Sequence, residues 1–457
     1  MNKKMTRRDF LRVSAAAAAT GVLAACAPTA PSTGYTPTAA TNKSVSTVVF
    51  QTHWQPWFQD YLKKTAIPLF EQQNPDIKVQ VLWKTDDPQG ILTEIAGGTA
   101  PDVIQHYTSS ADFFSLAPAG VFLPIENYVK ASKVINQDDY VPAQWAGVTW
   151  NGHIYGLFGG DGGPWPALGW NRKMFTAAGM DPSAPPQTLD DMYTVAQKLT
   201  KLDASGNVLQ MGLDIQDAEG PEVRVASMMC DSPFISADKT KILFTEGNWE
   251  DYLARYAKLV NLVTPAQYKA YDTKWTTWIS PTSAFANNKE AMLIDGSWEP
   301  GAMPSAMVDK TYDVGWEYIP SFDQKKYVLM SMHQYTIPRT TKVPEAAFRW
   351  AEWLMTNQQY NVDVFNTHGN FMWSKSLVKV YDTSKAPGLA WFLDAPNHAD
   401  KVYGPADFGC LVSGELSKLF AQAQQFVAYG TKTPKQALAD ITATLQPDLD
   451  AAWKAIS

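Results

Sequence analysis

The sequence predicts an α/β protein made of two successive α/β regions, and three observations support this fold class. The chain has 457 residues, which is enough to build more than one hydrophobic core. Hydrophobic residues account for 45% of it and charged residues for 18%, as in globular rather than disordered proteins. Segments with the two-residue period of a strand alternate with segments of helical period, which is the order of parallel βαβ units.

The first α/β region begins near residue 45. Residues 45–50 are rich in β-branched and aromatic side chains, and residues 77–83 alternate between the two faces of a strand. An amphipathic helix is predicted between them and ends before Pro75, and a second helix ends at Gly98. Residues 101–104 then begin a third strand, so the region has the order strand, helix, strand, helix, strand.

The second α/β region follows the same logic. Residues 167–171 are a predicted strand, and Thr188 is a predicted helix N-cap with an acidic residue at the third helical position. Residues 203–207 (Asp-Ala-Ser-Gly-Asn) favour a simple turn over a calcium loop, because the ligand spacing of an EF-hand is absent. A strand at residues 211–215 comes next.

The last third of the chain adds further strands and helices. Residues 291–295 and 313–319 are strand candidates, and residues 328–338 form a long β-like run that can cross between the two regions. Residues 344–358 predict a helix that begins at a proline and carries an apolar stripe. The C-terminus continues in helical pattern from Thr433.

The first 26 residues predict an export signal and a lipid anchor. Arg7 and Arg8 form a twin-arginine pattern, residues 13–25 are too short to span a membrane stably, and a lipobox ends at Cys26. We therefore predict a signal peptide at residues 1–25, acylation of Cys26, and a flexible Ala/Pro/Thr/Ser-rich tether at residues 26–44. The protein is then extracytoplasmic and anchored to a bacterial membrane, on its periplasmic or outer face.

Composition and missing motifs exclude several functions. The net charge of −7 argues against nucleic acid as a partner, and no apolar run reaches the ~18 residues of a membrane span. The sequence has no P-loop, G-x-S-x-G, C-x-x-C or H-E-x-x-H motif, so we expect no catalytic residues, cofactor or metal. Cys230 and Cys410 can form a disulfide outside the cell or remain two buried thiols.

Nine segments then occur in an order that resembles one known family. They are the export signal with lipobox; a strand, aromatic loop and helix; residues 74–79 (NPDIKV); 98–103 (GTAPDV); 120–125 (GVFLPI); 154–157 (IYGL); 168–175 (LGWNRKMF); 285–298 (FANNKEAMLIDGSW); and 342–347 (KVPEAA). The chain from about residue 45 onward resembles the family 1 extracellular solute-binding proteins of ABC importers, the maltose-binding-protein class.

This resemblance implies the two-lobed periplasmic-binding-protein fold of type II. Each lobe is expected to be a mainly parallel sheet flanked by helices, with the ligand cleft between the lobes and closure by hinge motion. The expected ranges are 45–154 and 331–388 for the N-terminal lobe and 155–330 and 389–457 for the C-terminal lobe. The implied partners are a carbohydrate ligand, the permease subunits of an ABC transporter and, through acylated Cys26, the lipid bilayer, and the implied state is a monomer.

The chain contains 17 tryptophans, more than its cores require, so we expect some of them to face a ligand. Sugar sites combine aromatic platforms with fixed polar partners. Trp298 matches the tryptophan of the family's Gly-x-Trp segment, and the other candidates lie in loops after predicted strands or near the crossovers. The predicted ligand-binding residues are Trp54, Trp57, His106, Tyr107, Asp161, Trp165, Trp298, His333 and Trp373.

Each candidate also has an explanation as a packing residue, because tryptophan is usually mostly buried and a lone histidine is more often structural. Weaker candidates on the same grounds are His53, Trp83, Asp86, Gln334, Asn370 and Phe408. The glycine-rich residues 159–164 replace the simple Tyr-Pro crossover of the maltose binders, so maltose itself is not implied. The alternatives are a secreted carbohydrate-active enzyme, which needs only two carboxylates, and a binder of a polyamine or glycerol phosphate.

Overall fold

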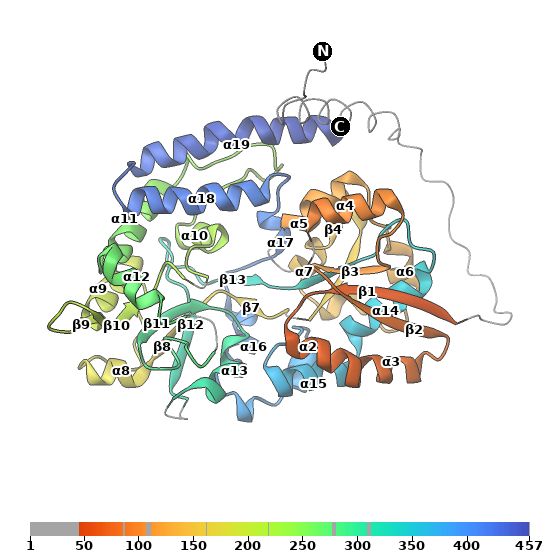
Figure 1. The fold of residues 1–457 in the computed structure, drawn as a ribbon, viewed down its shortest axis with the longest axis horizontal. Coiled ribbons are helices and arrows are strands. Elements are labelled where there is room, and N and C mark those ends of the chain that lie inside the picture. Colours follow the sequence, from red (N-terminus) through yellow and green to blue (C-terminus); the bar gives the residue numbers. More distant parts are fainter. Residues whose placement is uncertain are drawn as a thin grey trace, which may run out of the picture. The chain divides into compact units, whose positions relative to one another are not determined.

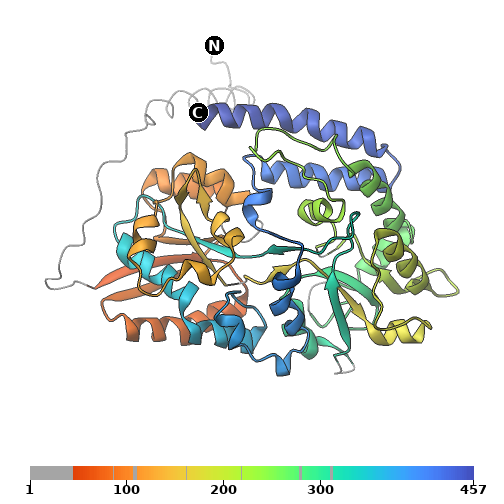
Figure 2. The ribbon, with the colours of Figure 1, turned by 180° about the vertical axis from the view of Figure 1, so that it is seen from behind.

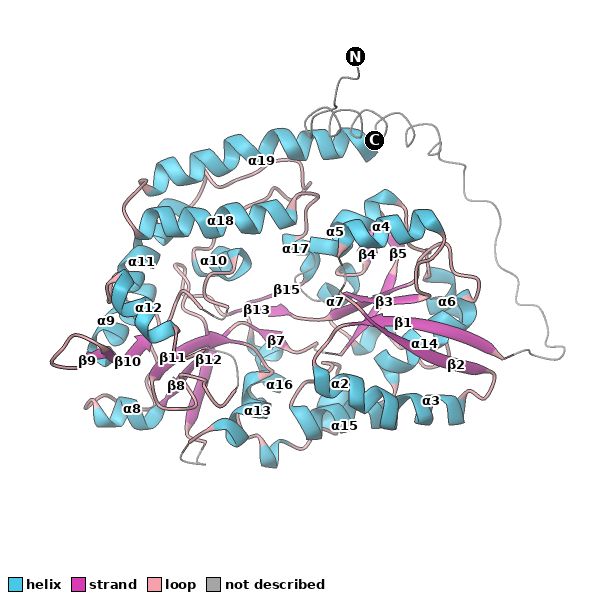
Figure 3. Cartoon of the chain, viewed as in Figure 1, coloured by secondary structure: helices cyan, strands magenta, loops and turns pink. Residues whose placement is uncertain are grey.

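The computed structural model describes residues 45–85, 87–106, 111–160, 162–217, 219–276, 280–308 and 312–456. The predicted signal peptide, Cys26 and tether lie outside the described residues, as do the candidates Asp86, Tyr107 and Asp161. Figures 1 and 2 show the described body as two α/β lobes, and Figure 3 shows the strands of each lobe enclosed by helices.

The first lobe is built around a five-stranded sheet in the order β2-β1-β3-β14-β6. β1 pairs in parallel with β2 and β3, whereas β14 is antiparallel to both β3 and β6. The strands are β1 (Ser46–Thr52), β2 (Ile77–Trp83), β3 (Val103–His106), β6 (Gly156–Gly159) and β14 (His333–Thr336). The predicted first three strands of the chain are therefore confirmed.

Local signals explain the helices that flank this sheet. α4 (Pro88–Gly97) begins where the Asp87 carboxylate accepts a hydrogen bond from the Gly90 N–H at 2.9 Å, and it ends at Gly98, which has a φ of +69°. α14 (Pro344–Thr356) begins at the predicted proline and buries Trp350 and Leu354 against β1 and β6. The remaining helices and short strands of this lobe are α2 (Pro56–Tyr61), a π-helical turn (Leu62–Ala66), α3 (Ile67–Gln73), α5 (Ala111–Leu116), α6 (Glu126–Ala131), α7 (Pro142–Ala146), β4 (Thr149–Trp150), β5 (His153–Ile154) and α15 (Gln358–His368).

The second lobe is built around a sheet in the order β12-β8-β11-β10-β9. Only the β10–β11 pair is parallel, and the other three pairs are antiparallel. The strands are β8 (Ala167–Asn171), β9 (Lys201–Leu202), β10 (Val208–Leu213), β11 (Glu290–Asp295) and β12 (Val314–Tyr318). The segments predicted as strands in this region are confirmed.

The expectation of mainly parallel sheets holds for the first lobe, where β1, β2, β3 and β6 run in one direction and only β14 runs against them. In the second lobe, three of the four neighbouring pairs are antiparallel. A βαβ unit returns the chain to the same edge and makes neighbouring strands parallel. In the first sheet, β14 brings the chain back from the second lobe and runs antiparallel to both of its neighbours, β3 and β6, while β6 keeps the direction of β3. The pairing also places β6 in the first sheet, so the passage to the second lobe starts after Gly159 rather than at residue 155.

A small third sheet lies where the chain passes between the lobes. Its order is β15-β13-β7, with β7 (Pro164–Trp165), β13 (Tyr327–Met330) and β15 (Lys401–Tyr403). The predicted long β-like run thus divides into β13 of this sheet and β14 of the first-lobe sheet, with residues 331–332 between them.

Helices of the second lobe follow their predicted signals. Thr188 caps α9 (Leu189–Leu199): its hydroxyl accepts the Asp191 N–H at 3.0 Å and the Asp191 carboxylate accepts the Thr188 N–H at 3.1 Å. The others are α8 (Arg172–Ala177), α10 (Val223–Met229), α11 (Trp249–Val260), α12 (Pro265–Asp272), α13 (Glu299–Ala306), α16 (Leu389–His398), α17 (Pro405–Phe408), α18 (Ser413–Ala428) and α19 (Pro434–Ile456). α18 and α19 lie side by side along the top of Figure 1.

Two open questions from the sequence are answered by the fold. Cys230 and Cys410 are both buried free thiols and do not pair. Residues 203–207 form a turn in which the Asp203 carboxylate accepts backbone hydrogen bonds from Ser205 and Asn207, each at 2.8 Å. None of the helices among the described residues combines the length and hydrophobicity needed to cross a bilayer.

Candidate functional site

The glycine-rich run after β6 passes through a narrow contact region, which we call the junction. The Gly162 N–H donates to the Phe371 carbonyl at 2.7 Å, and a Cβ atom at Gly163 would overlap the Ser297 side chain. Gly160 has a φ of +70°, and a Cβ atom there would lie 2.8 Å from His333 Nδ1. The junction therefore brings together the loop after β6, the loop after β11, β14 and the segment after α15.

The first-lobe side of the junction is a fixed network around His333. Thr52 Oγ1 donates to Gln105 Oε1 at 2.5 Å, and Gln105 Nε2 donates to His333 Nδ1 at 2.6 Å. His333 therefore carries its hydrogen on Nε2. Burial lowers the pKa of His333 to about 3, so the ring is neutral, and the Trp54 ring meets it edge-on at 4.7 Å.

Several predicted site residues are held by packing contacts. Trp54 is buried against Phe58, and Trp57 is half-buried and stacks on His368 with ring centroids 3.4 Å apart. His106 is fully buried, with Nε2 2.8 Å from Thr336 Oγ1.

Trp373 is buried as well, and its Nε1 donates to the Leu393 carbonyl at 3.0 Å. Trp54, Trp57 and His333 thus lie in one chain of ring contacts at the junction, whereas His106 lies within the first sheet.

The second-lobe side of the junction has buried polar atoms without a hydrogen-bond partner among the described residues. They include the neutral atoms Trp165 Nε1, Ser297 Oγ and Trp298 Nε1, and the carboxyl oxygens of the neighbouring Glu299 also have no partner. Each belongs to a residue within two positions of the Gly163–Ser297 contact. Because buried hydrogen-bonding groups are nearly always paired in folded proteins, these atoms can receive polar groups of a ligand.

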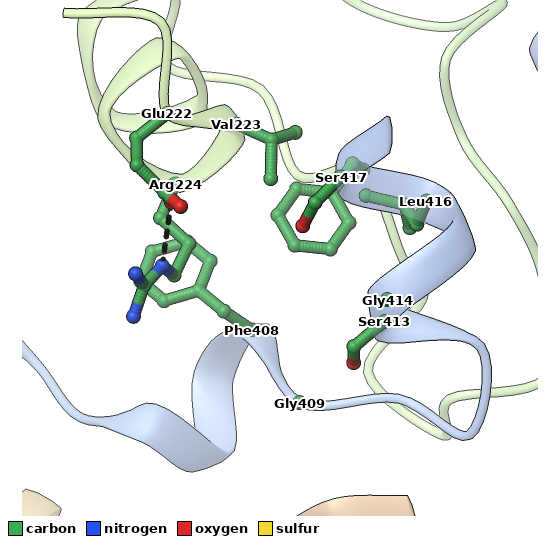
Figure 4. Close-up of a pocket in the computed structure, with 10 residues that line it drawn as sticks. Glu222, Val223, Arg224, Phe408, Gly409, Ser413, Gly414, Leu416 and Ser417 are labelled. Carbon is green, nitrogen blue, oxygen red and sulfur yellow. Dashed lines mark hydrogen bonds and ion pairs between the residues drawn. The ribbon is translucent and has the colours of Figure 1, made fainter. Parts of the chain in front are cut away.

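A cavity of about 220 Å³ lies next to the junction, between α10 and the α17–α18 segment (Figure 4). We call it the α10–α18 cavity. It is lined by Glu222, Val223, Arg224, Phe234, Phe408, Gly409, Ser413, Gly414, Leu416 and Ser417. A Cβ atom at Gly409 would overlap the ring of Phe114 on α5, so the first lobe lies against this wall of the cavity.

Arg224 connects the cavity to the junction. Its guanidinium lies 4.8 Å from the centre of the Trp165 ring, and its Nε donates to Glu222 Oε2 at 2.9 Å. Trp165 is 3% exposed, and the guanidinium covers one face of its indole ring. Arg224, not Trp165, therefore lines the cavity. The Nε1 atom of Trp165 has no hydrogen-bond partner among the described residues.

Of the residues that line the cavity, Phe408 is a candidate from the sequence, whereas Glu222 and Arg224 are not. They follow the loop after β10, and loops after the carboxyl ends of strands were the rule that nominated candidates in the first lobe. They lie nine and eleven residues after the end of β10, at the start of α10, so a rule limited to the loop directly after a strand does not reach them.

Comparisons with known proteins agree with this architecture. Residues 52–361 match the family described as bacterial extracellular solute-binding protein, and residues 4–24 match the twin-arginine translocation signal sequence. The family match covers more than half of the chain, so the protein belongs to the bacterial extracellular solute-binding proteins. It is an exported solute-binding component of the ABC-transporter class.

Individual relatives are distant. An uncharacterized ABC transporter extracellular-binding protein of Pyrococcus horikoshii is 24% identical over 369 residues, covering 78% of each chain. The mannotriose-bound structure of the protein CpMnBP1 has a TM-score of 0.72 at 20% identity and covers 87% of this chain and 99% of its own. A Thermotoga lettingae ABC transporter solute-binding protein bound to α-D-tagatose has a TM-score of 0.70 at 20% identity, covering 88% and 100%.

Proposed function

We propose that this protein captures a sugar between its two lobes and delivers it to the membrane permease of an ABC importer. The observation that carries the proposal is the group of three unpartnered polar atoms at the junction, on Trp165, Ser297 and Trp298. Two indole N–H donors and one hydroxyl are neutral and suit the hydroxyl groups of a sugar. Structures of similar fold bind mannotriose and tagatose, which supports this ligand class.

The ligand couples to lobe closure through contacts that join the lobes. Gly301 of α13 and Gly369 after α15 approach so closely that a Cβ atom at either position would overlap the other backbone. We propose that the structure corresponds to the closed form and that an open form separates this contact. A ligand that bonds to both lobes favours the closed form by the difference between its affinities for the two forms.

Among the predicted site residues, we propose that Trp298 and Trp165 touch the ligand through their Nε1 atoms. Trp54, Trp57 and His333 form the rigid first-lobe side of the site. We further propose that Cys26 is acylated and holds the body at the membrane surface. Replacing Cys26 with Ser and comparing membrane and soluble fractions, with mass spectrometry of the N-terminus, tests the anchor.

Titration of tryptophan fluorescence with mannotriose, D-tagatose and a broader sugar panel tests the ligand class. We expect a saturable change with at least one neutral sugar, because Trp165 and Trp298 lie at the junction. A response to a polyamine, glycerol phosphate or a peptide with no response to any sugar would overturn the carbohydrate proposal. Release of reducing ends over time would instead indicate a carbohydrate-active enzyme.

A further inference from the structure

We propose that the α10–α18 cavity is a subsite for a single uncharged sugar unit, and that the Glu222–Arg224 pair makes the protein discriminate against ionised sugars. The inference rests on the proposed sugar-binding function and specifies the chemistry of the ligand. It concerns residues outside the set nominated from the sequence, apart from Phe408.

The pair is held in place before any ligand arrives. Arg224 is fixed on one face by the Trp165 ring at 4.8 Å and at its Nε by Glu222 at 2.9 Å. The side chains of Arg224 and Glu222 are only 12% and 28% exposed, respectively. A ligand therefore meets a preorganised donor and acceptor and need not spend binding energy on ordering two long side chains.

The rest of the lining suits one sugar ring. Figure 4 shows the Glu222–Arg224 pair on one side of the cavity and Ser413 and Ser417 on the other. The rings of Phe234 and Phe408 lie 5.9 Å apart at 25° and supply an apolar surface for the C–H face of a sugar. The volume of about 220 Å³ is below the ~300–1,000 Å³ of ordinary ligand pockets, so the cavity has room for one sugar unit.

The charges that line the cavity favour a neutral sugar over an ionised one. Glu222 and Arg224 are the only ionisable side chains among the ten that line the cavity, and they sum to zero. Each hydroxyl of a neutral sugar can donate to the carboxylate or accept from the guanidinium, so two neighbouring hydroxyls satisfy both groups. An ionised sugar loses water from its charge on entering the site, and the opposite charges of Glu222 and Arg224 largely cancel, so no net attraction offsets that cost.

The experiment is isothermal titration with the glucose and galactose series, each as the neutral hexose, the uronic acid and the 2-amino sugar. Each compound competes against the sugar that responds in the fluorescence panel. For the wild-type protein we expect the neutral form to bind about tenfold or more tightly than either ionised form. The Glu222→Gln variant should shift the preference toward the uronic acid, and Arg224→Gln toward the amino sugar.

Arg255→Gln is the matched control. Arg255 also lies over an aromatic ring, Phe322 at 4.9 Å, and pairs with Asp190 and Asp251, but it does not line the cavity. This variant should leave the neutral-to-ionised preference unchanged. Arg224→Lys keeps the charge and should retain the wild-type direction of preference, which separates a charge effect from a folding defect.

The outcomes separate this proposal from the proposed function. If sugars bind but the preference stays the same in Glu222→Gln and Arg224→Gln, or if no single unit competes, the subsite is overturned and the sugar-binding function stands. If no sugar binds to the wild-type protein, the proposed function itself fails, and the subsite fails with it.

Discussion

The junction and the acidic cluster of the second lobe both bury polar side chains. They differ in how the cost of burying those polar groups can be offset. The acidic cluster consists of Asp214, Glu290, Asp295 and Glu299, all buried. Glu290 and Asp295 are the two ends of β11, and Ser297 of the junction follows two residues later. The two regions are therefore neighbours on one strand and its following loop.

Three of the four carboxyl groups in the acidic cluster have raised pKa values, which favours their protonated form. Burial raises the pKa of Asp214 to about 7, and burial together with neighbouring carboxylates raises the pKa values of Glu290 and Glu299 well above their ordinary range. At the junction, burial instead keeps His333 neutral, and the unpartnered atoms of Ser297 and Trp298 are neutral too. We therefore expect the cluster to respond to pH, whereas the function proposed above assigns the junction atoms to a ligand.

The largest expected effect is a pair of opposite pH dependences. The pKa of Asp214 is higher in the folded than in the unfolded chain, so its contribution to stability is complete below about pH 4 and is lost as pH rises toward about 7. At about 1.4 kcal/mol per pKa unit, this amounts to a few kcal/mol. In thermal unfolding from pH 4 to 7, Asp214→Asn should gain stability relative to wild type as pH rises. The exposed control Asp60→Asn should show no such gain, and an equal gain would contradict the assignment.

The second prediction concerns His333, whose effect has the opposite sign. Its pKa is about 3 in the folded protein, below the ordinary value of 6.5, so its contribution is complete above about pH 6.5 and is lost as pH falls. His333→Gln keeps an acceptor for Gln105 and removes the titration. The unfolding temperature of this variant should rise relative to wild type as pH falls from 6.5 to 4. A constant difference across that range would show that His333 does not titrate on unfolding.

Enlarging Gly163 tests the close approach at the junction. In Gly163→Ala the new methyl group overlaps Ser297 and lies 2.8 Å from the Phe371 ring. We expect a loss of about 1–3 kcal/mol in unfolding free energy and more than about tenfold in sugar affinity. Gly97→Ala is the control, because its nearest neighbour is Thr99 Oγ1 at 3.7 Å and alanine favours a helix. Unchanged affinity in Gly163→Ala would place the ligand elsewhere.

The smallest effect separates binding from stability. Ser297→Ala removes a buried hydroxyl that has no partner, so we expect unchanged or slightly higher stability and about tenfold weaker sugar binding. Ser283 is equally buried, but its Oγ accepts the Ala286 N–H at 3.3 Å. Ser283→Ala should therefore lose about 1 kcal/mol of stability with unchanged binding. Measuring the unfolding free energy and the sugar affinity of both variants tests whether Ser297→Ala changes only binding and Ser283→Ala only stability.

The fold class was predictable because its signals are local. Thr188 capping α9, Gly98 ending α4 and Pro344 opening α14 all act within a few residues of themselves. Strand direction was not predictable in the same way. Whether β14 runs parallel or antiparallel to β3 depends on where the chain returns from the second lobe, which no local pattern encodes.

The site was predictable only in part, for a similar reason. An aromatic residue in a loop becomes a packing residue when a distant segment covers it, as the segment with Leu393 does for Trp373. No sequence spacing distinguishes Arg224, which lines the cavity, from Arg255, which does not. Both pair with carboxylates and cover aromatic rings. The glycine run is visible in the sequence. The contacts with Ser297 and Phe371 that leave no room for a larger side chain at Gly163 are not.

The position of β14 in the first-lobe sheet has a consequence for biosynthesis. β14 separates β3 from β6, yet residues 333–336 leave the ribosome only after all five strands of the second-lobe sheet have been made. Until β14 is synthesised, β3 and β6 lack their common partner strand and leave unpaired edges, since long-range strand pairing requires both partners. Although the protein is divided into two lobes, we expect neither half of the chain to fold alone, and a nascent chain shorter than about 340 residues to depend on protection from aggregation.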